Sequence, residues 1–207
     1  MNLPNALSAG RIVATPLIAA LPFFNSSALR LTAFVLFLIA AITDYVDGHV
    51  ARSRKEETDL GKMLDPLADK LLLVGTFVPM YMLAKTMPFE TLIGPIGLPL
   101  WIVLVVLGRE VFMTVFRQAA AKRGVVIAAI RSAKWKTGFQ LFWQGSAYCW
   151  FWATTLASEK HAEGAAWNAF ALFNGTVGAS VMVIAVLLTI YSLIVYMRSF
   201  GSVFANG

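Results

Sequence analysis

Long apolar stretches separated by short polar connections run along the whole chain. Each apolar stretch is too long and too continuous for a β-strand, and several approach the roughly 20 residues that a helix needs to cross a hydrocarbon core. The pattern predicts six helices, at residues 5–24, 29–50, 64–84, 97–121, 132–157 and 167–197. Because a spanning segment in lipid must satisfy its own backbone hydrogen bonds, we expect an all-α integral membrane bundle of six transmembrane helices.

The segments around these helices add little to the arrangement. MNLPNAL, residues 1–7, is expected to lie along the membrane surface as a short amphipathic lead-in to the first helix. It lacks the basic start and small-residue cleavage site of a signal peptide, so we expect it to be retained. No soluble domain, low-complexity tract or clear repeat interrupts the pattern, which predicts a single membrane domain over residues 1–207.

Composition supports a lipid environment. Hydrophobic residues make up 58% of the chain and charged residues 14%, whereas a soluble domain normally carries roughly a quarter charged residues. We interpret the net charge of +6 as attraction to anionic lipid or phosphate, and we expect no nucleic-acid partner. The single cysteine, Cys149, cannot form an intrachain disulfide and is expected to be a small buried hydrophobic residue.

Lysine and arginine residues are distributed unevenly between the two predicted membrane faces. Arg30, Lys85 and Lys160 fall on one side, which leaves 14 of the 17 basic residues on the other. Basic residues concentrate in cytoplasmic loops of membrane proteins. We therefore predict that the N-terminus, the acid-rich connection after the second helix, the 117–136 segment and the C-terminus are all cytoplasmic.

Four aspartates lie where the second predicted helix ends and the third begins, in DYVDGHVARSRKEETDLGKMLDPLADK, residues 44–70. Asp44 and Asp47 are one turn apart, as are Asp65 and Asp69, so each pair occupies one face of its helix. Antiparallel packing would place the four carboxylates opposite one another, where protonation or bound cations must neutralise them. Carboxylate oxygens suit Mg²⁺, Mn²⁺ or Ca²⁺ rather than zinc, and two ions sharing carboxylates are typical of phosphate-transfer sites.

Structural roles are the alternative for each acid taken singly. Asp65 before Pro66 is also an ordinary helix start, an N-cap followed by proline at the first helical position. The first pair of aspartates could instead form ion pairs with the arginines that follow it. Acids within membrane segments are nevertheless functional candidates by default, and Gly48 and Gly61 beside them would allow close approach of a ligand or a helix.

The spacing of these residues resembles the full signature of the CDP-alcohol phosphotransferase family: Asp44-x-x-Asp47-Gly48-x-x-Ala51-Arg52, eight residues, then Gly61-x-x-x-Asp65-x-x-x-Asp69. The resemblance implies six membrane helices with an active site at the cytoplasmic side. It implies two divalent metal ions, Mg²⁺ or Mn²⁺, held mainly by Asp44, Asp47 and Asp65 with Asp69 nearby. Asp69 would also be the general base that takes the proton from the acceptor alcohol. The implied CDP-binding residues are Asp44, Gly48, Ala51, Arg52, Gly61 and Asp65, with Arg52 meeting the diphosphate.

A second basic cluster, within residues 108–140, bears on the identity of the acceptor. Arg117, Lys134 and Lys136 are candidates for binding an acceptor that carries phosphate. Arg109 falls inside an apolar helix beside Glu110, where it either pairs with other helices or joins the site.

The region is similar to the phosphatidylglycerophosphate synthases of the same family, which share an RE element, a downstream arginine and a K-x-K-T element. The opening NLPNALSAGRIVATP is similar to theirs as well. Their pattern usually has glycine at the position of Ala133 and alanine at that of Gly108, which bears on the subfamily and leaves the chemistry unchanged. The resemblance implies CDP-diacylglycerol as donor, sn-glycerol 3-phosphate as acceptor, and phosphatidylglycerophosphate and CMP as products.

Other functions remain as alternatives. The same chemistry with phosphatidylglycerol would give cardiolipin, and inositol phosphate is a third acceptor. A cation-coupled membrane transporter also uses intramembrane acids, and a noncatalytic membrane scaffold would need none of them. The family resemblance further implies a homodimer. We expect a multi-pass protein of the bacterial cell (inner) membrane, with a mitochondrial membrane as the alternative for a processed form.

Overall fold

The structure, a computed structural model, describes residues 3–54, 59–125, 127 and 131–200, without the side chains of residues 3–4, 44–54, 59–63, 65, 131–132 and 200. The described residues form helices and connections, with one isolated β-bridge between Phe89 and Ile96. The elements are α1 (Leu3–Ala20), the 3₁₀ turn η1 (Leu21–Phe23), α2 (Ser27–Arg54), α3 (Asp59–Leu83), α4 (Leu100–Lys122), α5 (Arg131–Glu159) and α6 (Ala165–Phe200). The predicted all-α architecture with six helices is confirmed.

The N-terminal segment belongs to the first helix, and its predicted place along the membrane surface stays a prediction. Residues 3–7 are the first turns of α1, and both Asn5 and Ser8 are buried. These polar side chains face the interior because Arg11, one turn further along, lies there as well and donates to the Ser8 hydroxyl. The helix ends where Pro22, which lacks a backbone N–H, follows in η1.

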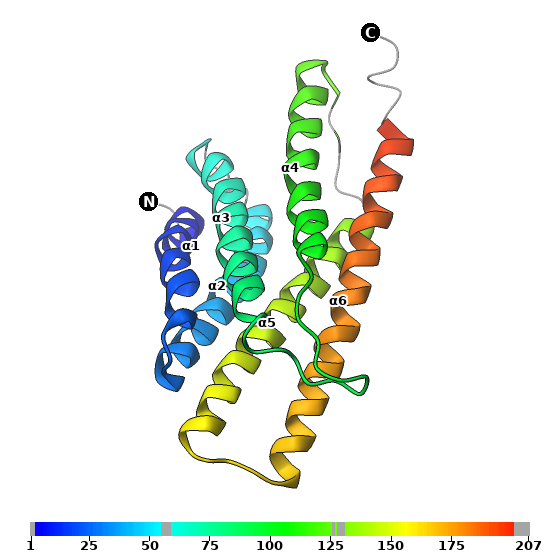
Figure 1. Ribbon diagram of the computed structural model, residues 1–207. Helices are drawn as coiled ribbons and strands as arrows, with labels where there is room; N and C mark the ends of the chain where they lie inside the picture. Colours follow the sequence, from blue (N-terminus) through cyan, green and yellow to red (C-terminus); the bar gives the residue numbers. More distant parts are fainter. Residues whose placement is uncertain (1–2, 55–58, 126, 128–130, 201–207) are drawn as a thin grey trace.

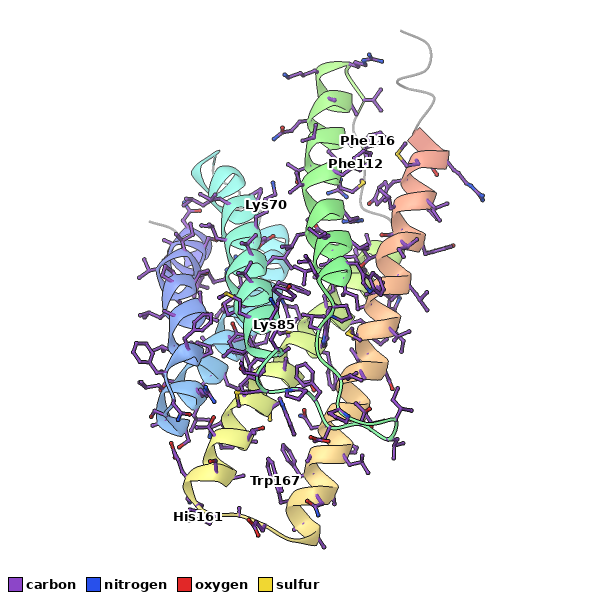
Figure 2. The ribbon with its side chains drawn as sticks, viewed as in Figure 1. Lys70, Lys85, Phe112, Phe116, His161 and Trp167 are labelled. Carbon is purple, nitrogen blue, oxygen red and sulfur yellow. The ribbon has the colours of Figure 1, made fainter. Side chains whose placement is uncertain are left out.

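The six helices run alternately up and down, so the start of α1, the end of α2, the start of α3 and the end of α6 lie at the same end of the bundle (Figure 1). We call this the junction end. Helices α1, α2 and α3 cluster on one side and α4 and α6 on the other, while α5 crosses between the two groups and contacts α2, α3 and α6. Lys70 lies toward the junction end, whereas Lys85 lies at the far end of α3 and His161 in the opposite turn (Figure 2).

The bundle exposes apolar side chains on its outside and buries polar ones. Large hydrophobic residues on the outer faces of α1 and α4, such as Val13 and Val111, are among the most exposed of the described residues. Gln144 and Thr189, in contrast, are fully buried between helices. Soluble monomers rarely expose extended apolar surface, and buried polar contacts between helices are typical of membrane bundles. The distribution indicates that lipid rather than water surrounds the helices.

Among the described residues, three helical segments are long and apolar enough to cross a membrane: Asn5–Phe23, Pro66–Leu83 and Ala165–Ser199. Ser27–Thr43 is a shorter apolar helix. Helix α4 carries Arg109, Glu110 and Arg117 among its apolar residues, and α5 carries several amides and hydroxyls that are buried inside the bundle. The chain is therefore a multi-pass membrane protein in which α4 and α5 carry polar side chains into the bundle.

Hydrophobic packing joins the two groups of helices. The main core lies between α3, α4, α5 and α6, where the Phe77 ring meets the edge of Trp143 at 5.1 Å between centroids. A second cluster packs α1 and α2 against α5 through Phe37 and Tyr148, whose rings stack at 5.5 Å. A third cluster at the junction end packs Phe116 of α4 against α6. These contacts fix the positions of the helices that carry the polar side chains described below.

A polar tie closes the end of the bundle opposite the junction. The Glu159 carboxylate at the end of α5 accepts hydrogen bonds from the Ser27 hydroxyl and, at 2.8 Å, from the Ser27 backbone N–H. These bonds cap the first turn of α2 and hold the pKa of the Glu159 carboxyl below its ordinary value. Nearby, Arg30 is buried and donates to the Pro22 carbonyl and the Thr155 hydroxyl.

Gly175 allows a direct test of how the α3–α4 connection packs against α6. A Cβ built on Gly175 would lie 1.7 Å from the Glu90 carbonyl oxygen, a backbone atom that no rotamer change can move. We expect Gly175→Ala to lower the free energy of unfolding by about 1–3 kcal/mol through overpacking. Thermal unfolding of the purified protein in detergent, followed by circular dichroism, measures the effect. Gly108→Ala is the matched control, since no atom of a neighbouring helix lies within 4 Å of a Cβ there, and an unchanged midpoint for Gly175→Ala would contradict the described contact.

Candidate active site

A cavity of about 140 Å³ opens between α2, α3, α4 and α5. Its described lining combines apolar residues with two acids, a lysine and polar side chains: Ala41, Asp69, Leu72, Leu73, Glu110, Lys136, Thr137, Gln140, Leu141 and Gln144. Ala41 precedes Asp44 by one turn of α2, so the cavity lies directly beside the helix turns that carry the aspartate motif.

The Asp69 side chain forms an ion pair with Arg11 of α1. Its Oδ1 lies 2.9 Å from Nη1 of Arg11, and the Arg11 side chain is only 3% exposed. The carboxylate itself stays accessible, with 55% of the Asp69 side chain exposed. A carboxylate that is oriented by a buried cation while facing a cavity can accept a proton from a molecule bound there.

Glu110 sits at the centre of a charged cluster that joins three helices. Its Oε1 accepts hydrogen bonds from Arg109 Nη1, at 2.9 Å, and from the Lys136 ammonium of α5. Arg109 also donates to the Ser192 hydroxyl of α6 at 3.2 Å. The side chains of Arg109 and Lys136 are 6% and 4% exposed. Two cations and one carboxylate leave the cluster with a formal charge of +1, which favours an anion in the adjoining cavity.

The deeper wall of the cavity is polar although it lies inside the bundle. The Gln144 amide donates to the Thr76 hydroxyl at 2.6 Å, and the Gln140 amide donates to Thr189 at 3.2 Å. Gln140 and Gln144 are one turn apart on α5, and Thr137 is one turn before Gln140. Together these side chains give the cavity hydrogen-bonding groups along one continuous face of α5.

Of the residues predicted to bind an acceptor phosphate, Lys136 alone is among the cavity's described lining residues. Arg109 is not among the described lining residues, but it forms an ion pair with Glu110, which is. Arg117 is exposed, with Nη2 2.9 Å from the Tyr196 hydroxyl and its guanidinium carbon 5.4 Å from the centre of that ring. Lys134 is exposed as well, because residues two apart on a helix point in different directions.

Most of the aspartate motif is described by its backbone only. Asp44, Asp47, Gly48, Ala51 and Arg52 belong to the last turns of α2, and Gly61 and Asp65 to the first turns of α3; the side chains of the five residues other than glycine lie outside the described residues. The helical backbone agrees with the one-turn spacing on which the predicted metal and CDP site depends. Their roles stay predictions.

Three polar cavity residues and one supporting residue were not predicted as part of the site. Thr137, Gln140 and Gln144 carry a sequence signal, since they are polar residues at one-turn spacing in an otherwise aromatic and apolar helix. Arg11 interrupts the first apolar stretch, where an unpaired charge would be costly. Its partner Asp69 is 58 residues away in the chain, so the pairing follows from the packing of α1 against α3.

Comparison with known proteins gives a consistent result. A family model for CDP-alcohol phosphatidyltransferases matches residues 1–191. A CDP-diacylglycerol–glycerol-3-phosphate 3-phosphatidyltransferase of Rickettsia typhi is 39% identical over 141 residues, which cover 68% of this chain and 72% of that protein. Its Arabidopsis thaliana chloroplastic/mitochondrial counterpart is 31% identical over 212 residues, covering 98% of this chain and 64% of that protein.

A cardiolipin synthase (CMP-forming) of Oryza sativa subsp. japonica is 31% identical over 209 residues, covering 96% of this chain and 57% of that protein. The chain thus spans less than two thirds of the length of these two plant relatives. The family match extends over nearly the whole chain and includes the aspartate motif, the cavity and most of α6. The chain belongs to the CDP-alcohol phosphatidyltransferase family.

Proposed function

We propose that this chain is an enzyme that transfers the phosphatidyl group of CDP-diacylglycerol to sn-glycerol 3-phosphate, giving phosphatidylglycerophosphate and CMP. The observation that carries the proposal is a single cavity lined by both Asp69 and Lys136. A carboxylate and a buried ammonium in one chamber suit an acceptor that presents a hydroxyl and a phosphate. The Rickettsia and Arabidopsis relatives are named for this donor and this acceptor.

Each residue has a chemical role in the proposed reaction. Lys136 binds the phosphate of glycerol 3-phosphate, and Asp69 takes the proton from its attacking hydroxyl. The hydroxyl oxygen then bonds to the phosphorus that carries diacylglycerol, while the bond from that phosphorus to the CMP oxygen breaks. Arg11 keeps the Asp69 carboxylate oriented toward the cavity through its 2.9 Å ion pair.

The aspartate motif would supply the donor atoms for two divalent metal ions, Mg²⁺ or Mn²⁺. The accessible Asp69 carboxylate follows Asp65 by one turn of α3, and carboxylate oxygens are the ligands that these ions prefer. Asp44, Asp47, Asp65 and Asp69 would hold the ions, and Gly48, Ala51, Arg52 and Gly61 would complete the pocket for CDP. When bound, the ions neutralise the diphosphate and stabilise the CMP that leaves.

The size of the cavity favours a small acceptor. Its volume of about 140 Å³ is below the roughly 300–1,000 Å³ of pockets that enclose drug-sized ligands. Glycerol 3-phosphate is the smallest of the three candidate acceptors. Phosphatidylglycerol, the acceptor for cardiolipin, would have to bring two acyl chains to the same place.

The proposal includes the placement of the enzyme in the membrane. All six helices would cross the bilayer of a bacterial inner membrane, as part of a homodimer, with the junction end and both termini in the cytoplasm. The three basic residues predicted for the opposite face, Arg30, Lys85 and Lys160, all lie toward the end away from the junction, which supports this orientation. The lipid donor could then keep its acyl chains in the bilayer while its headgroup reaches the site.

CMP release by the purified protein in detergent tests the proposed function. CDP-diacylglycerol is offered with glycerol 3-phosphate, phosphatidylglycerol or inositol phosphate in separate reactions, with Mg²⁺ or Mn²⁺ and after removal of the metal by a chelator. We expect metal-dependent release with glycerol 3-phosphate alone. Release with another acceptor would keep the chemistry and change the substrate, whereas no release from folded, metal-supplied protein with any acceptor would favour the transporter.

A further inference from the structure

Glu110 uses one of its two carboxylate oxygens in its described ion pairs. Both of its hydrogen bonds, from Arg109 and from Lys136, go to the same oxygen, Oε1. Within the part of the chain that the structure describes, no donor bonds to Oε2, and this atom is not among the fully buried polar atoms that lack a partner. Oε2 is therefore accessible, and Glu110 is one of the residues that line the cavity.

The two ion pairs also determine the ionisation state of the Glu110 carboxyl group. Two cations that are each more than nine-tenths buried lie within hydrogen-bonding distance of the carboxyl group, so it is ionised. An ionised carboxylate accepts hydrogen bonds and donates none. A phosphate oxygen would be repelled by Oε2, whereas a hydroxyl would be bound by it.

The cavity therefore presents three different groups to a bound molecule. Asp69 and Glu110 are carboxylates from α3 and α4, and Lys136 is a cation from α5. Glycerol 3-phosphate carries a phosphate and two hydroxyls, of which one attacks and the other, on the middle carbon, does not react. A site with one cation and two carboxylates has one partner for each of the three groups.

We infer that Glu110 is a specificity-determining residue that accepts a hydrogen bond from the non-reacting hydroxyl of the acceptor. The inference rests on the proposed function and deepens it. Lys136 holds the phosphate, Asp69 takes the proton of the attacking hydroxyl, and Oε2 of Glu110 distinguishes a glycerol phosphate from a phosphate monoester with a single hydroxyl. Arg109 is a positioning residue in this arrangement, because it orients Glu110 and bridges it to Ser192 of α6.

The test compares two acceptors that differ only in the hydroxyl in question. CMP release is measured with glycerol 3-phosphate and with 3-hydroxypropyl phosphate, which lacks the middle hydroxyl, and the ratio of the two kcat/KM values is taken. Because a hydrogen bond to a charged group is lost, wild-type protein is expected to prefer glycerol 3-phosphate by about 10- to 100-fold. A wild-type ratio near one overturns the inference without any variant.

The variant Glu110→Gln keeps the shape of the side chain and removes the charged acceptor. We expect its ratio to fall to about threefold or less. A purely structural role for Glu110 would lower kcat/KM for both acceptors together and leave the ratio at its wild-type value, which would overturn the inference. Glu110→Asp provides a second variant that keeps the pairing charge while withdrawing the carboxylate, and it is expected to lower the ratio as well.

Glu159→Gln is the matched control, because it removes a bonded glutamate at the opposite end of the bundle and is expected to leave the ratio unchanged. Failure of the proposed function is distinguishable from failure of the inference. No CMP release by wild-type protein with glycerol 3-phosphate overturns both, whereas release without discrimination between the two acceptors overturns the inference alone.

Discussion

Asp69→Asn is expected to lower kcat for CMP release by about 10²- to 10⁴-fold, because general base catalysis contributes a factor of that size. The amide cannot take the proton of the attacking hydroxyl, and it is a poorer ligand than a carboxylate for a divalent ion. The fold should survive, since the amide oxygen can still accept the hydrogen bond from Arg11 and the side chain is more than half exposed. Loss of activity can then be attributed to the site.

Steady-state kinetics with CDP-diacylglycerol and glycerol 3-phosphate, at saturating Mg²⁺ or Mn²⁺, measure the effect. Glu163→Gln makes the same carboxylate-to-amide change in an exposed turn at the far end of the bundle and should retain wild-type kcat. Circular dichroism of both variants checks that the helices are intact. An Asp69→Asn protein that keeps more than about a tenth of wild-type kcat would assign the base to another residue.

The helices could be predicted from the chain because each one carries a long, predominantly apolar run, and the differences lie at their ends. Helix α2 continues to Arg54, beyond the predicted end at Val50, and α3 begins at Asp59 instead of Leu64. Charged residues do not stop a helix in the way that proline does, so hydropathy alone places the ends too close to the apolar segments. The acid motif consequently lies on helical backbone throughout its described part.

The sequence predicted those parts of the candidate site that depend on residue spacing within a single helix. Asp69 was found because its spacing from Asp65 belongs to a local pattern, and the structure places it at the cavity. Its pairing with Arg11, and the connection of Lys136 to Glu110, join helices that are distant in the chain. Such contacts depend on how whole helices pack, which residue spacing within one helix does not determine.

The two lysines of the KWKT element illustrate the same limit. Both were predicted to bind the acceptor phosphate, yet the structure buries Lys136 at the cavity and leaves Lys134 exposed. Two residues along a helix correspond to a rotation of about 200°, so the side chains leave the helix in nearly opposite directions. Charge and spacing in the sequence identified the KWKT element, whereas the burial of one face of α5 determines that Lys136 lines the cavity and Lys134 does not.

Lys136→Gln is expected to raise KM for glycerol 3-phosphate by roughly 10- to 100-fold, since a hydrogen bond from a charged donor to the acceptor phosphate is lost. KM for CDP-diacylglycerol should change by less than about threefold, because that donor is proposed to bind through the aspartate motif. Glu110 keeps its partner Arg109 at 2.9 Å in the variant, so no carboxylate is left unpaired in the interior.

Lys134→Gln is the matched control for this change, because it removes the same charge from the same helix two residues away. As an exposed lysine screened by salt, it should alter KM for glycerol 3-phosphate by less than about threefold. Initial rates over a range of glycerol 3-phosphate concentrations, with the donor saturating, separate KM from kcat for both variants. Equal increases in KM for the two variants would mean that the phosphate binds outside the cavity, where both lysines act through their charge alone, and would contradict the site proposed for the acceptor.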